Sequence, residues 1–429
     1  MAWRGSWRSL QLGLIVLAAS INPALAQVEY SVHFEMDKPQ HLLGEPIFCR
    51  FVIRNTGTRV FAFRYRTPTR SPAPDYEQEP RFAVKDAEGR SLPDPGPRPC
   101  GSAPGTMVYG SVTLPPGHVH AENWLLNQWA QFAAPGRYHV RAERRLALLL
   151  PGPHPGEFEE KPAAYALALD EFSVQVVPAT RAQLEAAFRP YLSAVQDPQN
   201  PNPAQAVTVL TSLPQPFFLD PLVAMTKAAN AQRWDRRDAL DGLARLNTAA
   251  SWRAILNLFR SGDASNSAGK EAGVEVEDPA RSHALQLLAE KGDPAFIPVF
   301  VGMLAKSHEP MRGDILRSLG FFHDVRAYQP LYDNLHSTAV TDRMNAILGL
   351  KNLGGKEVIP ALLAALNDPE AQVRQVANFA LEGLTGHQAA NSADSTRGGV
   401  ERVASDWHAW WRAHAGSFSP PRPPACHDW

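Results

Sequence analysis

The sequence predicts a β + α protein of two main domains, an antiparallel β-sandwich followed by a solenoid of stacked helix pairs. In the N-terminal part, short stretches alternate apolar and polar residues and are separated by turns rich in Gly and Pro, which is typical of half-buried strands. In the C-terminal part, one helical pattern returns every 31 residues. Such a period indicates a solenoid, whose units bury their apolar faces only against neighbouring units.

Composition limits the class of protein. The chain has 429 residues, of which 44% are hydrophobic and 20% charged, as in ordinary globular proteins. The length allows two or three domains. The net charge is −1, so the chain lacks the excess of positive charge that binding to nucleic-acid phosphates needs. We expect no nucleic-acid partner.

Residues 1–26 resemble a bacterial-type secretory signal peptide. Arg4 and Arg8 precede an apolar run over 10–21, and Ala24-Leu25-Ala26 forms a small-residue cleavage site. The run is too short to cross a bilayer, which takes roughly 20 apolar residues, and no later stretch is long and apolar enough. We expect cleavage after Ala26, export to the periplasm or secretion, and no transmembrane segment in the mature chain.

Residues 27–178 are predicted to form the β-sandwich. Val28 to Met36 alternates throughout, and Gly/Pro turns with no helical period between them favour two antiparallel sheets. The predicted strands cover 28–36, 47–54, 59–66, 81–86, 106–114, 118–126, 136–148 and 167–177. Of the three cysteines, Cys49 and Cys100 belong to this domain, so they are the favoured disulfide pair, which leaves Cys426 over.

The turns of this half resemble those of bacterial immunoglobulin-like domains. The matching segments are Leu43 to Pro46, Arg54 to Gly57, Leu114 to Gly117 and Pro135 to Val140. The resemblance implies an immunoglobulin-like fold. It also implies that Tyr138 hydrogen-bonds across a corner of the sandwich.

After a predicted helical linker over 179–203, repeats are expected over 204–386. Their most regular position is an arginine column, Arg281, Arg312, Arg343 and Arg374. Three and seven residues after each arginine the residue is apolar, as one face of a helix requires. Arg236 extends the column upstream once an insertion over 261–277 is allowed. This gives about five helix pairs.

The chain ends in three further predicted segments. Residues 387–399 form a polar loop, 400–414 a helix, and 415–429 a Pro-rich tail. The helix carries Trp407, Trp410, Trp411 and His414 on one face. These side chains could grip a ligand, but a terminal helix must cover the last repeat, so we interpret the face as a cap.

The last unit resembles the short HEAT repeats of phycobilisome-lyase-like bacterial proteins. Pro360 lies within the first helix, Asp368-Pro369 opens the turn, and Val373-Arg374 begins the second helix. The ending Leu384 to Gly386 and the segment Trp407 to Trp411 resemble the closing part of exported HEAT-repeat proteins, so the likeness covers 204–414. It implies Asp–Arg links between neighbouring repeats. Lys306 and Ser337 stand where Asp368 would recur, so we expect an incomplete ladder.

The usual catalytic and metal-binding motifs are missing from the sequence, and we predict no catalytic, cofactor-binding or metal-ligating residue. His118, His120 and Glu122 share one strand face and could meet a metal, but a solvated face is the favoured interpretation. The arginines between Arg50 and Arg70 could bind an anionic partner, yet nearby acidic residues favour an exposed, neutralised face. The arginine column itself is interpreted as structural.

We therefore expect an exported, non-catalytic scaffold that binds a protein partner on the solenoid surface, with no cofactor. This expectation rests on architecture. Two alternatives remain open. One is a lyase-like enzyme that acts on a protein partner. The other is an envelope protein whose sandwich binds glycan or inhibits a protease.

Overall fold

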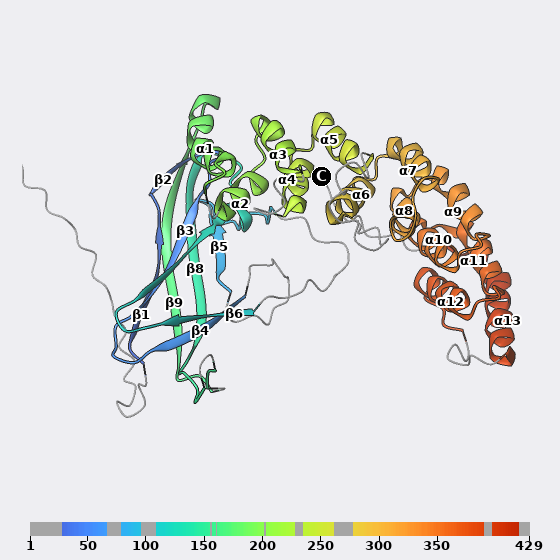
Figure 1. Ribbon diagram of the computed structural model, residues 1–429, viewed down its shortest axis with the longest axis horizontal. Coiled ribbons are helices and arrows are strands. Elements are labelled where there is room, and N and C mark those ends of the chain that lie inside the picture. The colour runs from blue at the N-terminus through green and yellow to red at the C-terminus, as the bar shows by residue number, and fades with distance from the viewer. Residues whose placement is uncertain are drawn as a thin grey trace, which may run out of the picture.

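The computed structural model describes residues 28–66, 79–95, 109–154, 157–159, 161–200, 203–227, 235–260, 278–389 and 397–419. A β-domain over residues 28–177 comes first, and helices then arch away from one end of it (Figure 1). The predicted signal peptide, the 261–277 insertion and the tail beyond residue 419 lie outside the described residues.

The β-domain has two sheets with one apolar core between them. Three antiparallel strands make the smaller sheet, β1 (Tyr30–Met36), β3 (Phe48–Asn55) and β7 (Val119–Leu125), in the order β1-β3-β7. The larger sheet has the order β2-β9-β8-β4-β6, with β5 also paired to β8; its strands are β2 (Gln40–Leu42), β4 (Phe61–Arg66), β5 (Arg81–Lys85), β6 (Tyr109–Leu114), β8 (Gly136–Leu149) and β9 (Ala164–Val177). Phe34, Phe51 and Phe63 are among the buried side chains that fill the core.

Each of the eight predicted strands is present, with ends shifted by a few residues. The sequence pattern missed β2, because three residues are too few to show an alternation. Its parallel pairing with Gln175–Val177 of β9 depends on segments far apart in the chain.

Cys49 is a free, fully buried thiol on β3. The structure therefore does not support the favoured Cys49–Cys100 pair, and Cys100 lies outside the described residues. Burial, together with the nearby carboxylates, raises the pKa of the Cys49 thiol to about 12, which leaves it protonated and unreactive at neutral pH.

The C-terminal part is a helical repeat solenoid. Its helices are α1 (Arg181–Gln196), α2 (Ala204–Ser212), α3 (Leu219–Met225), α4 (Arg236–Leu246), α5 (Ala249–Arg260), α6 (Pro279–Lys291), α7 (Ile297–Leu304), α8 (Met311–Leu319), α9 (Tyr328–Asn334), α10 (Val340–Leu353), α11 (Ile359–Ala365), α12 (Ala371–Thr385) and α13 (Arg397–His414). Short 3-10 turns cover 126–128, 216–218, 294–296, 320–322, 325–327 and 356–358.

The even-numbered helices from α2 to α12 pack one upon the next and line the inner side of the arch, while α3, α5, α7, α9 and α11 lie outside them (Figure 1). The inner helices approach closely in the middle of the solenoid. A Cβ added at Gly349 of α10 would lie 2.4 Å from the carbonyl oxygen of Leu316 on α8. Such an approach requires glycine, and it holds neighbouring units at a fixed spacing.

The described residues form six helix pairs, whereas the sequence predicted about five. The helix that the prediction left outside the repeats is α1, which packs against α2. Helix α1 occupies most of the predicted 179–203 linker, and its Phe188 is fully buried against Phe218. The segment is therefore a packed part of the solenoid. A capping box at Thr180 and Gln183 starts α1 soon after β9 ends.

The β-domain and the solenoid share a packed junction. Phe48 and Leu125 belong to the apolar core of the helices rather than to the core of the β-domain. Gln128 Nε2 donates to Ser212 Oγ at 2.9 Å, and Gln215 Nε2 donates to the carbonyl oxygen of Gly44 at 3.4 Å. These contacts hold the two parts in the arrangement that Figure 1 shows.

Helix α13 closes the far end of the solenoid. Trp407 is fully buried in the helical core, and its indole N–H donates to Asn378 Oδ1 of α12 at 2.6 Å. Trp410 stacks on the rings of His387 and His414. Asn378 is the only polar member of a repeat column that otherwise holds Leu285, Leu316 and Ile347. The exception marks the unit that meets the cap.

Replacing Trp407 by Ala should open the end of the solenoid. Removal of a fully buried Trp side chain costs about 3–5 kcal/mol, and in a solenoid the loss falls mainly on adjacent units. Hydrogen exchange should therefore accelerate in α11 to α13 while α4 to α8 keep their protection. Trp411→Ala, at a half-buried position of the same helix, serves as the control and should have a smaller effect. Equal acceleration in both variants would contradict the capping role of Trp407.

Candidate functional site

The arginine column closes the ends of the outer helices. Each arginine lies near the start of an inner helix and donates to a carbonyl at the end of the preceding outer helix or in the turn after it. The bonds are Arg236 Nε to Thr226 O (2.7 Å), Arg281 Nε to Phe259 O (3.1 Å), Arg312 Nη1 to Leu304 O (2.5 Å), Arg343 Nη1 to Ser337 O (3.0 Å) and Arg374 Nη1 to Asp368 O (2.7 Å). Carbonyls at a helix end lack intrahelical partners and favour a cation, so these bonds stabilise each unit.

Three of these arginines also bind a carboxylate of the next unit. Arg236 pairs with Asp278, Arg312 with Asp342, and Arg343 with Asp368, all at 2.8 Å. The gap predicted at Ser337 is therefore filled by an acid from another position, Asp342. Asp278 lies just before α6, and Asp342 lies within the first turn of α10.

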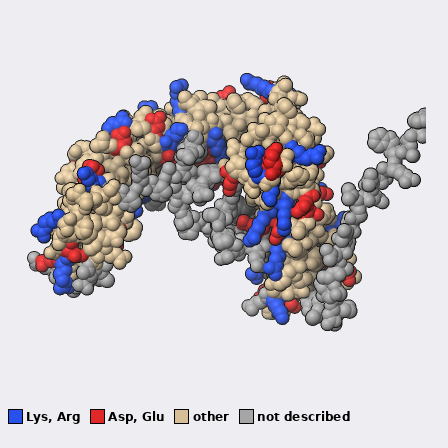
Figure 2. All heavy atoms as spheres, turned by 180° about the vertical axis from the view of Figure 1, so that it is seen from behind, with Lys and Arg blue, Asp and Glu red and all other residues tan. Residues whose placement is uncertain are grey.

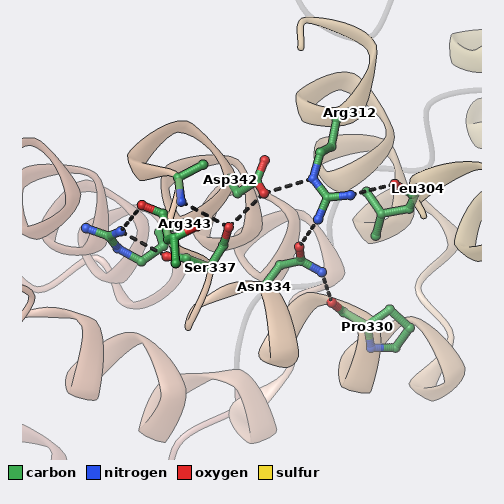
Figure 3. Close-up of polar contacts among 9 residues, drawn as sticks. Leu304, Arg312, Pro330, Asn334, Ser337, Asp342 and Arg343 are labelled. Carbon is green, nitrogen blue, oxygen red and sulfur yellow. Dashed lines mark hydrogen bonds and ion pairs between the residues drawn. The ribbon is translucent and has the colours of Figure 1, made fainter. Parts of the chain in front are cut away.

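Figure 3 shows how Asp342 replaces the missing acid. Ser337 occupies the position that corresponds to Asp368 one unit earlier in the chain. Its hydroxyl donates to Asp342 Oδ2 at 2.8 Å. Arg312 donates to the same oxygen through Nε and to Asn334 Oδ1 through Nη2, each at 2.8 Å. A hydroxyl thus positions a carboxylate from the neighbouring helix. The arginine column is structural, as its regularity indicated.

The pair of Arg343 and Asp368 is mostly buried, with side chains 11% and 10% exposed. Burial alone would raise the pKa of Asp368. The hydrogen bonds from Arg343 and from the backbone N–H of Glu370 outweigh burial and hold the pKa of this carboxyl below its usual range.

Asp368→Asn should therefore destabilise the solenoid in a pH-dependent way. Because the folded-state pKa lies below the unfolded value of about 3.9, the stabilisation is complete above that pH and disappears as pH falls through the folded pKa. At pH 7 we expect a loss of about 1–3 kcal/mol, shrinking below about pH 4. Urea unfolding across pH 3–7 measures it. Asp333→Asn, an exposed site on α9, is the control. A loss that is the same at pH 3 and pH 7 would rule out the ion pair as its source.

A second column lies on the inner surface, five residues after each arginine. We call it the inner column; from α4 to α12 it holds Asp241, Gln286, Arg317, Leu348 and Phe379. Its last four members are 31 residues apart. All five side chains are at least partly exposed, and Phe379 is 56% exposed. Unlike the arginines, these residues differ in chemistry from one unit to the next.

Neighbouring units contact one another across this surface. His283 Nε2 of α6 lies 2.6 Å from Asp241 Oδ1 of α4, and Arg317 of α8 hydrogen-bonds to Asn345 of α10. Each contact joins an inner-column residue to the residue two after the arginine of the next unit. Near the cap, the Lys351 ammonium lies 5.2 Å from the centre of the Phe379 ring. Three of the five inner-column residues therefore contact a neighbouring unit.

The chemistry of the inner surface changes along the arch. Helix α4 presents the carboxylates of Asp238 and Asp241, whereas α10 and α12 present Leu348, Phe379 and the cation of Lys351. Arg317 lies between the two ends. Phe379 of α12 is exposed and Leu348 of α10, the helix that packs against α12, is half-buried, so these two residues offer apolar surface to a partner.

Two candidate sites in the sequence, His118 to Glu122 and the arginines from Arg50 onward, belong to the β-domain rather than to the solenoid. His120 and Glu122 do not form a solvated face, which corrects that interpretation. Their side chains are half-buried, His120 lies 2.9 Å from Glu122 Oε1, and Arg144 of β8 donates to Glu122 Oε2 at 2.7 Å. His118 lies apart and contacts the Pro116 carbonyl oxygen. Among the described residues, no group of three His, Cys, Asp or Glu side chains is placed to hold a metal ion.

The arginine-rich segment after Arg50 is not one surface. Arg50 pairs with Glu35 at 3.0 Å on the smaller sheet. Arg64 lies on β4 of the larger sheet, while Phe61 and Phe63 are buried in the core. Residues 67–78, which include Arg70, Asp75 and Glu77, lie outside the described residues.

Comparison with known proteins agrees with the repeat architecture. Residues 342–368 match the family model of the PBS lyase HEAT-like repeat. No curated protein matches the sequence significantly. Among solved structures, designed armadillo repeat proteins for modular peptide recognition align over 48% of this chain and 94% of theirs, with 17% identity and a TM-score of 0.27. Human deoxyhypusine hydroxylase in complex with glycerol aligns over 53% and 97%, with 15% identity and a TM-score of 0.21. These TM-scores are too low to define a shared overall fold.

Sequence reasoning missed the inner column. The signal was the 31-residue spacing itself, because Gln286, Arg317, Leu348 and Phe379 recur as regularly as the arginines. Since their chemistry varies, only their shared exposure in the structure identifies them as one surface.

Proposed function

We propose that this protein is a binding scaffold whose inner surface holds an extended segment of a protein partner. The observation that carries the proposal is the inner column. It is exposed, chemically varied and built on packed helices, whereas the arginine and apolar columns around it are used by the fold. A solenoid surface of this kind suits a partner that runs across several units.

The inner surface favours a particular kind of segment. Carboxylates on α4 attract basic side chains, and the apolar site of Leu348 and Phe379 on α10 and α12 accepts a large apolar side chain. We propose that the segment carries basic residues toward α4 and an aromatic or aliphatic residue toward the cap. Charge would set its direction, and burial of the apolar residue would supply most of the affinity.

A displayed library of random peptides can test this preference directly. Peptides captured by the full chain should be enriched in a basic stretch separated from an aromatic or aliphatic residue. Leu348→Ala combined with Phe379→Ala should weaken a captured peptide about tenfold or more, as measured by fluorescence anisotropy. Val325→Ala combined with Tyr332→Ala, at exposed positions next to and on the outer helix α9, is the matched control and should leave affinity unchanged. If the outer pair weakens binding as much as the inner pair, the inner surface is not the site.

We also propose that the β-domain is immunoglobulin-like. The Tyr138 hydroxyl donates to the carbonyl oxygen of Ala134 at 2.6 Å, which resembles the tyrosine corner of such domains. The short parallel pairing of β2 with β9 departs from an all-antiparallel arrangement.

Export and the absence of catalysis are parts of the same proposal. The pattern of residues 1–26 supports export. None of the helices among the described residues combines the length and apolar character needed to cross a membrane. The lack of the usual catalytic motifs in the sequence supports a non-catalytic role. Covalent transfer of a pigment to a protein by the purified chain would favour the lyase-like alternative instead.

A further inference from the structure

The outward face of the larger sheet carries a row of exposed apolar side chains on β9. Tyr165, Leu167 and Leu169 alternate along the strand and are 51%, 56% and 48% exposed. Strand β9 is the outermost long strand of the larger sheet, because the short β2 pairs with it only at Gln175–Val177. Large apolar side chains that share one exposed strand face indicate an interaction surface.

Cations flank this apolar row. Arg137, Arg141 and Arg145 lie on the same outward face of β8, and Arg145 is directly opposite Leu167. Arg81 and Lys85 of β5 continue the face beyond β8. The guanidinium of Arg145 lies 4.4 Å from the centre of the Tyr165 ring, so the cationic and apolar groups are in direct contact.

The balance of charge on this face is positive. Its carboxylates are Glu143, opposite Leu169, and Glu171, opposite Arg141. Asp86 and Glu88, in the turn after β5, both pair with Arg90. Figure 2 shows Lys and Arg side chains gathered on the β-domain, with Asp and Glu side chains among them. The chain as a whole has a net charge of −1, so this excess is local.

We propose that the outward face of β5, β8 and β9 docks onto the surface of an anionic phospholipid bilayer. The apolar row would enter the boundary between headgroups and acyl chains, and the arginines beside it would contact lipid phosphates. Tyrosine and arginine suit this boundary, because each has an apolar body and a polar end. The outermost position of β9 lets the row reach the bilayer ahead of the rest of the sheet.

The charged and apolar side chains of this face argue against two other binding partners, a second copy of the chain and a nucleic acid. A second copy bound by a two-fold contact centred on β8 would bring the arginines of the two copies together, which costs binding energy. A nucleic acid would satisfy the arginines through its phosphates but would leave Leu167 and Leu169 exposed to water. The combination of an apolar row and adjacent cations fits an anionic amphiphilic surface.

Sedimentation with lipid vesicles tests the proposal. The purified full chain should bind vesicles of phosphatidylglycerol and phosphatidylcholine mixed in equal parts, and not vesicles of phosphatidylcholine alone. Binding should weaken at high salt, because part of it is electrostatic. Arg141→Glu combined with Arg145→Glu should lower the partition coefficient about tenfold or more. Leu167→Ser combined with Leu169→Ser should lower it while leaving its salt dependence in place.

Arg50→Glu combined with Arg54→Glu is the matched control. These arginines are exposed on β3 of the smaller sheet, and their reversal changes the net charge by the same amount. The control should bind vesicles as the unchanged chain does, and residues 1–26 contribute equally to every variant. No binding to the anionic vesicles at low salt, or equal loss in both charge reversals, would overturn the proposal. Circular dichroism checks that each variant is folded.

Discussion

The solenoid depends on the bond from one arginine to the end of the helix before it. An arginine at the start of each inner helix from α4 to α12 donates to a carbonyl at the end of the preceding outer helix, where carbonyls lack intrahelical partners, or in the turn after it. In three units the same guanidinium also binds a carboxylate of the next unit, so one side chain joins two helices of its own unit and a third helix beyond. The angle within a unit and the spacing between units are therefore fixed together.

That constraint explains why positions on the inner helices serve different purposes. Positions three and seven after the arginine are buried against the outer helix and neighbouring units, so they stay apolar. The position five after the arginine is at least partly exposed, so its side chain need not be apolar. Asp241, Arg317 and Phe379 can then differ in charge and size without disturbing the stack. A repeat protein gains a varied binding surface in this way, because structural and recognition residues are separated within one helical turn.

The β-domain and the solenoid offer two surfaces of different character. The inner column is a curved surface whose chemistry changes along its length, while the outward face of β8 and β9 is a sheet face with parallel apolar and basic rows. The junction through Phe48 and Leu125 joins the two domains by an apolar contact. In the proposed arrangement, the β-domain holds the protein at a membrane surface and the solenoid extends away from it to hold a partner. A mutation can abolish partner binding or membrane docking without affecting the other, because the two proposed roles use different residues.

The sequence alone determined the elements that follow from a local period. Alternation over two residues marked the eight longer strands, and the 31-residue spacing marked the solenoid and its arginines. Tertiary structure decided whatever depends on contacts between distant segments. Strand β2 is three residues long and exists because β9 lies beside it, and α1 belongs to the solenoid because Phe188 meets Phe218. Asp342 replaces the acid missing at Ser337 only because α10 brings it to Arg312. The inner column is regular in the sequence, but its residues vary in chemistry. Their shared exposure depends on how the helices pack together, so no single helix could show it.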